Sequence, residues 1–168
     1  MKIVINFSPV SCEVKPYRKA ADVILLLIIL PCLLSLINLN FAQNWKIHFF
    51  SAAIILAAVV FGAGGGLLAG LTGSLYSALF LGNPYILVGN ALFGLLAGVF
   101  YKKTGKIIPA VLLAYLGQLP WLILSDYYFV HLPAIFIAKL AIVLFLTNAF
   151  WAALIHLSLN PIKKLFSC

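Results

Sequence analysis

Long apolar segments, separated by short polar or glycine-containing breaks, run through most of the chain. A helix that crosses a membrane needs about 20 mostly apolar residues. Cut at charges, prolines, Gly-Asn pairs and aromatic clusters, the sequence predicts about six spans, at roughly 22–41, 46–62, 65–81, 85–101, 107–124 and 131–159. We therefore expect an all-α integral membrane protein, built as a bundle of about six transmembrane helices.

One of these cuts has an alternative. The second and third spans are separated only by the glycine-rich run from Gly62 to Gly66, without a charge or a proline. The same pattern is compatible with one long helix that bends at the glycines, because glycine is a common site of helix kinks. Residues 46–101 therefore contain either three spans or fewer, kinked helices.

Composition excludes a soluble domain and gives little support to an enzyme. Hydrophobic residues make up 65% of the chain and charged residues 8%, against roughly 45–50% and about 25% in globular proteins. Asp126 is the only acid after residue 22, and the three histidines and three cysteines are scattered, without metal-ligand or CxxC spacing. We expect no catalytic pair, no metal site and no cofactor.

The positive charge of the chain predicts its orientation. The formal net charge is +8, and Lys and Arg gather in short cytoplasmic loops of membrane proteins. With six spans, one side collects both termini and the loop after the fourth span, and its basic residues are Lys2, Lys15, Arg18, Lys19, Lys102, Lys103, Lys106, Lys163 and Lys164. Only Lys46 falls on the other side. We therefore expect a multi-pass protein of the cell membrane with a cytoplasmic segment at 1–21, a transmembrane domain at 22–159 and a basic cytoplasmic tail at 160–168; no nucleic-acid partner is indicated.

Small residues recur at helical spacing in the middle of the chain. In the second and third predicted spans they occur every four residues, at Ala58, Gly62, Gly66 and Gly70. The fourth predicted span contains another pair at this spacing, Gly94 and Gly98. Such spacing allows close helix–helix approach in lipid. It is compatible with plain bundle packing and with an interface that moves.

Several polar and aromatic residues are predicted to lie at one depth. At 1.5 Å per residue, Asn90, Gln118 and Lys139 each lie about 8–12 Å below the outer ends of their spans. Aromatic side chains fall at similar levels, which predicts a ligand cavity with polar anchors. The candidate substrate-binding residues are Lys139, Asn90, Gln118, Tyr85, Tyr115, Trp121, Tyr76 and Asp126.

Each polar candidate also has a structural interpretation. Lys139 can extend toward the headgroups or pair with Asp126 instead of holding an anionic ligand, since a lone charge in hydrocarbon is costly. Asn90 and Gln118 can instead form hydrogen bonds between helices that hold the bundle together. Asn148 lies deeper in the last span, and we assign it to hydrogen bonding between helices.

Two stretches resemble a known family. Residues 61–74 read Phe-Gly-Ala-Gly-Gly-Gly-Leu-Leu-Ala-Gly-Leu-Thr-Gly-Ser, and residues 89–103 read Gly-Asn-Ala-Leu-Phe-Gly-Leu-Leu-Ala-Gly-Val-Phe-Tyr-Lys-Lys. Together with the length and the six predicted spans, residues 50–106 resemble the substrate-binding S components of energy-coupling factor (ECF) transporters. This resemblance implies high-affinity capture of a vitamin or related micronutrient for an ABC importer. It also implies a transmembrane T component and two cytoplasmic ATPases as partners.

The resemblance has one departure and one rival. Members commonly dock onto the T component through an Ala-x-x-x-Ala face on the first helix, but residues 22–41 contain no alanine; Ala53 and Ala57 provide that spacing in the second span. The rival is a membrane scaffold similar to the rod-shape protein D family, or a sensor domain, acting through protein partners and needing no pocket.

Overall fold

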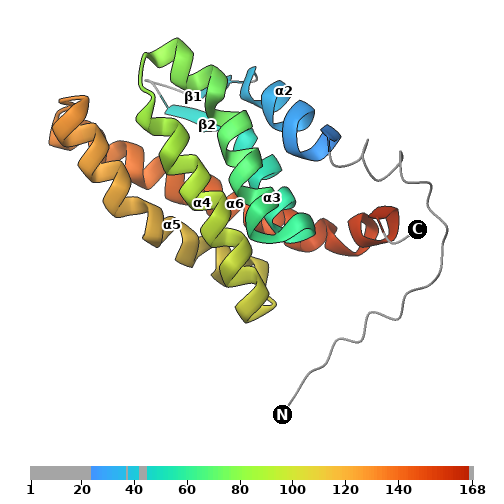
Figure 1. Ribbon diagram of the computed structural model, residues 1–168. Helices are drawn as coiled ribbons and strands as arrows, with labels where there is room; N and C mark the ends of the chain where they lie inside the picture. Colours follow the sequence, from blue (N-terminus) through green and yellow to red (C-terminus); the bar gives the residue numbers. More distant parts are fainter. Residues whose placement is uncertain (1–23, 37, 42–44, 167–168) are drawn as a thin grey trace.

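The computed structural model describes residues 24–36, 38–41 and 45–166, with side chains described at 24–36 and 49–158. The elements in chain order are the π-helix η1 (Leu25–Ile29), α2 (Leu30–Leu36), the strands β1 (Asn38–Phe41) and β2 (Trp45–His48), the helices α3 (Phe50–Leu81), α4 (Tyr85–Thr104) and α5 (Ile107–Leu124), the π-helix η2 (Ser125–Phe129) and α6 (Ala134–Phe166) (Figure 1). The predicted segment 1–21 lies outside the described residues. Residues 160–166 of the predicted tail continue α6.

Four helices are long and apolar enough to cross a membrane. They are Phe50–Leu81, Tyr85–Thr104, Ile107–Phe129 and Ala134–Ser158. Large apolar side chains cover the outside of the bundle; Leu79, Ile135 and Leu157 are each more than 70% exposed. Water disfavours such a surface, whereas lipid tails match it. The fold is therefore that of a helical membrane protein.

Helix α3 reverses its direction at Gly62. This residue has φ 71° and ψ −159°, which interrupts the helix. A β-carbon at Gly66 would lie 2.9 Å from that of Ala58, and one at Gly73 would lie 3.4 Å from that of Phe50. Residues eight apart in a straight helix are separated by about 12 Å. Residues 50–61 (the N-terminal arm) and 63–81 (the C-terminal arm) therefore run antiparallel, side by side (Figure 1).

The reversal agrees with neither alternative for residues 46–101 in full. The break falls at the first glycine of the run, as the division into two segments expected. The N-terminal arm is about 18 Å long and the C-terminal arm about 28 Å, so only the latter has the length of a span. The expectation of six full spans is therefore not reproduced here.

The first predicted span also ends early. The helical part, Leu25–Leu36, is shorter than a span. Residues 38–41 instead pair with 45–48 as an antiparallel hairpin, with Asn38 opposite His48 and Phe41 opposite Trp45. Polar and apolar residues alternate in both segments, which is the pattern of a strand. This hairpin is the exception to the all-α expectation.

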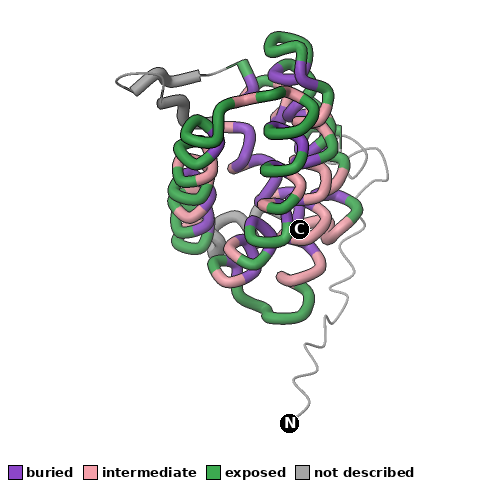
Figure 2. The backbone as a smooth tube through the Cα atoms, turned by 90° about the vertical axis from the view of Figure 1, so that its left-hand side faces the viewer, coloured by how far each residue is buried: buried purple, intermediate pink, exposed green. Residues whose placement is uncertain are grey.

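The C-terminal arm of α3 and helix α4 are in direct backbone contact. A β-carbon at Gly66 would collide with the Gly94 carbonyl, and one at Gly98 would collide with the backbone of Ala63. The two predicted series of small residues thus face each other. Ile54 and Phe93 belong to the buried core. Buried positions line the inside of the bundle and exposed positions its outside (Figure 2).

These contacts define two ends of the bundle. The Gly62 turn and the α4–α5 connection lie at one end, because Gly98 meets Ala63. The last turn of α4 and this connection carry three exposed lysines, Lys102, Lys103 and Lys106, so we call this the basic end. The opposite end contains the α3–α4 turn and η2.

Candidate functional site

Helices α4 and α5 enclose a line of polar contacts in the half of the bundle away from the basic end. Gln118 belongs to the buried face of α5, which also includes Ala114 and Leu122. It is only 5% exposed, and its Nε2 donates a hydrogen bond to Oδ1 of Asn90 on α4, at 3.5 Å. Asn90 and Gln118, which the sequence predicts at equal depth, are thus in contact in the structure.

Trp121 forms the next contact toward the opposite end. Its indole Nε1 donates to the carbonyl oxygen of Tyr85 at 3.2 Å. The Tyr85 ring stacks on Phe129, with centroids 4.8 Å apart. Gly89 makes room for the indole, since a β-carbon there would lie 3.3 Å from Cδ1 of Trp121. A glycine thus allows α4 to approach this tryptophan closely.

Asp126 ends this line of contacts, and its partner is Asn83. Both side chains are buried, and Nδ2 of Asn83 donates to Oδ1 of Asp126 at 3.3 Å. Oδ1 of Asn83 also accepts a bond from the Tyr85 backbone N–H at 3.1 Å, which fixes the turn into α4. Sequence reasoning missed Asn83, because Gly82-Asn83-Pro84 served there only as a break between spans. An asparagine before a proline in a turn was the available signal.

Lys139 lies apart from this cluster. It is exposed on α6, and within the described residues it has neither a hydrogen bond nor an ion pair. The structural alternative in which Lys139 pairs with Asp126 is therefore not found. The exposed position agrees with extension of the lysine along the bundle surface.

The two remaining tyrosines also lie outside the cluster. Tyr115 is buried, and its hydroxyl donates to the Ala141 carbonyl at 2.5 Å, which ties α5 to α6. Tyr76 is 39% exposed and stacks on Phe80. Of the eight predicted binding residues, the structure gathers Asn90, Gln118, Tyr85, Trp121 and Asp126 along the α4–α5 contact.

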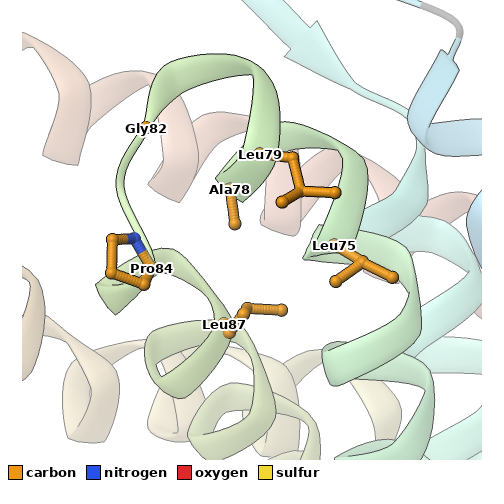
Figure 3. Close-up of a pocket in the computed structure, with 6 residues that line it drawn as sticks. All are labelled: Leu75, Ala78, Leu79, Gly82, Pro84 and Leu87. Carbon is orange, nitrogen blue, oxygen red and sulfur yellow. The ribbon is translucent and has the colours of Figure 1, made fainter.

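An apolar pocket of about 230 Å³ lies at the α3–α4 turn (Figure 3). Its lining residues are Leu75, Ala78, Leu79, Gly82, Pro84 and Leu87. None of the predicted binding residues belongs to this lining. The lining of this pocket is mostly apolar, which suits an apolar group better than a polar vitamin.

Two polar atoms on α6 stand out because they lack partners. Oδ1 of Asn148 and Nε1 of Trp151 are buried and have no hydrogen-bond partner in the part of the chain that the structure describes. The prediction that Asn148 bonds to another helix is therefore wrong for this oxygen. Nothing in the local sequence distinguishes this asparagine from the bonded Asn90.

The contacts of the gathered polar residues are hydrogen bonds and ring stacking. Asp126 is their only carboxylate. Within the described ranges, no three His, Cys, Asp or Glu side chains come close enough to hold a metal ion. No family model matches the chain, and no curated protein or solved structure is significantly similar to it.

Proposed function

We propose that this protein is the membrane-embedded substrate-capture subunit, or S component, of an ECF-type importer for a vitamin or related micronutrient. The observation that carries the proposal is the gathering of five predicted binding residues along α4 and α5, away from the basic end. Buried amides are costly in lipid, so their presence indicates a role. The resemblance of residues 50–106 to S components supports the same conclusion.

The proposed orientation places the basic end in the cytoplasm. Lys102, Lys103 and Lys106 are exposed there, and the positive-inside rule favours that side. The polar cluster then lies in the outer half of the membrane, where a capture subunit meets its solute. Both termini are proposed to be cytoplasmic and the protein to reside in the cell membrane.

The second candidate is a scaffold or sensor that acts through protein partners. One observation favours it: Asn90 bonds to Gln118 and Asn83 bonds to Asp126, so these side chains also serve as links between elements. A bundle held together in this way needs no ligand.

Partner identification separates the two candidates. The tagged protein is purified from native membranes in mild detergent, and its companions are identified by mass spectrometry. The S-component proposal predicts a T component and two ATPases in stoichiometric amounts. Recovery of cytoskeletal or cell-wall synthesis proteins without ATPases would favour the scaffold. An unrelated tagged membrane protein of similar size controls for non-specific capture.

A further inference from the structure

The apolar pocket at the α3–α4 turn lies beyond the close contact between these two helices. The last backbone contact before the turn is at Gly70, where a β-carbon would collide with the backbone of Asn90. The next glycine of the C-terminal arm, Gly73, has α2 and the N-terminal arm as its nearest neighbours instead. The glycine contacts with α4 thus end before the pocket, and a space of about 230 Å³ remains on the turn side of them.

The pocket has a small residue at its floor and leucines at its mouth. Ala78 is buried, and its side chain points into the space between the two helices, with Pro84 and Leu87 across from it (Figure 3). Leu75 and Leu79 complete the lining, and they are 47% and 75% exposed. The pocket is therefore continuous with the outer surface of the bundle.

This outer surface belongs to the part of the protein that faces lipid. Helices α3 and α4 are each long and apolar enough to cross a membrane. Water gains few hydrogen bonds in an apolar pocket, and such cavities stay dry. A hydrocarbon chain, in contrast, restores the packing contacts that the lining of a void loses. Lipid tails are thus both the molecules at the mouth and the ones that fit inside.

The helices that form the pocket carry no charge near it. Residues 50–101 contain no Asp, Glu, Lys, Arg or His, and the lysines that follow them lie at the basic end. Asp126 lies at the same end of the bundle as the pocket, but it is buried and accepts a hydrogen bond from Asn83. A site of this kind recognises a hydrocarbon chain and not a charged headgroup.

We propose that the pocket binds one acyl chain of a membrane lipid, from the leaflet opposite the basic end, with Ala78 at the end of the chain and Leu79 beside it. The proposal concerns a lipid and not the captured solute. It therefore holds whether or not the protein is part of an importer.

The bound chain also supports the α3–α4 turn. Gly82 and Pro84 line the pocket and flank Asn83. The backbone N–H of Asn83 donates to the carbonyl oxygen of Ala78 at 3.0 Å, and its side chain holds Asp126. A chain that packs against this turn stabilises the link between the turn and η2, so lipid should raise the unfolding temperature.

The test uses the full-length protein, reconstituted in vesicles of dioleoyl phosphatidylcholine and extracted again in mild detergent. Native mass spectrometry then counts the lipids that remain on each chain. One lipid should persist after the others are removed, and returning it to delipidated protein should raise the unfolding temperature. Vesicles of dioleoyl phosphatidylglycerol should give the same result, because no charged residue distinguishes the headgroups. Retention of no lipid, or of only one of the two headgroups, would overturn the proposal.

Two variants assign the retained lipid to the pocket. Leu79→Ala removes part of the lining and should reduce retention on the order of tenfold. Its matched control is Leu157→Ala, since Leu157 is 79% exposed on α6. Ala78→Phe fills the pocket from its floor, so it should lose the lipid while the lipid-free protein unfolds at the same or a higher temperature. Ala138→Phe, at an exposed alanine of α6, should retain the lipid.

The variants also give results that contradict the proposal. Equal retention by Leu79→Ala and Leu157→Ala would place the lipid elsewhere on the surface. If Ala78→Phe does not fold, this pair of leucine variants decides. A partner protein that is lost from Ala78→Phe, with lipid retention unchanged, would assign the pocket to a protein contact. Lipid retention without ATPase partners would refute the transporter proposal alone and leave this site intact.

Discussion

The carbonyl oxygen of Gly94 occupies the space that a β-carbon would take at Gly66. The same holds in reverse, since the Gly66 carbonyl meets a β-carbon built at Gly94. The C-terminal arm of α3 and helix α4 are therefore packed backbone against backbone. In lipid, where apolar surface gives no drive for helices to associate, such contact is a main source of stability.

Gly66→Ala should destabilise the protein by about 1–3 kcal/mol, because the added methyl group forces the two backbones apart. Gly64→Ala is the matched control, since a β-carbon at Gly64 meets nothing within 4 Å. It should be neutral or slightly stabilising. Thermal unfolding in detergent measures both. Equal losses in the two variants would show that the contact contributes nothing specific.

Gly62→Ala should cost about 1–3 kcal/mol for a different reason. There is open space around Gly62, but its φ of 71° with ψ of −159° is a conformation almost restricted to glycine. Gly105, with φ 66° and ψ 1°, is in the left-handed region that asparagine tolerates. Gly105→Asn should therefore leave the unfolding temperature nearly unchanged. A stable Gly62→Ala variant would contradict the reversal of α3 at this residue.

Asn83→Leu should destabilise by about 1–3 kcal/mol, because it leaves the buried Asp126 carboxylate without its donor. Adding Asp126→Leu should restore part of the loss, since both polar partners are then gone. Lys139→Met should leave stability unchanged, because Lys139 is exposed and unpaired within the described chain. A large loss in Lys139→Met, absent in the Asp126→Leu background, would instead indicate the Lys139–Asp126 pair.

The outcome for these residues shows what the sequence can predict here. Counting residues along the helices placed Asn90 and Gln118 at one depth, and they are in contact. Such a count does not tell which side of its helix a residue faces. Lys139 shares the predicted depth but is exposed on α6. Helix faces are decided by packing between helices, which depends on contacts far apart in the chain.

Within the described residues, four helices, and not six, are long enough to cross a membrane, and the difference arises at turns that the sequence left open. Gly62 marked a break, but the sequence did not determine that the chain doubles back there, since a glycine permits both a kink and a reversal. The strand at residues 38–41 was predicted as the end of the first helical span, residues 22–41. Its alternating pattern is only four residues long, and apolar runs this short are ambiguous between helix and strand.

Asn90 and Gln118 should be coupled in a double-mutant cycle of leucine substitutions, by about 0.6 kcal/mol as for other hydrogen bonds between membrane helices. Unfolding free energies of the wild type, both single variants and the double variant give this value. If the two residues also contact a ligand, Gln118→Leu should weaken binding while the purified variant stays folded. Normal binding in both single variants would restrict them to a structural role.

Solute capture is tested most directly by thermal unfolding of the detergent-purified protein against a panel of water-soluble vitamins and their precursors. A ligand present at a thousand times its dissociation constant stabilises the folded state by about 4.1 kcal/mol. The account predicts a marked rise in unfolding temperature with one compound or one closely related group, and none with the others. Unfolding temperatures that stay constant across the whole panel would contradict it and favour the scaffold.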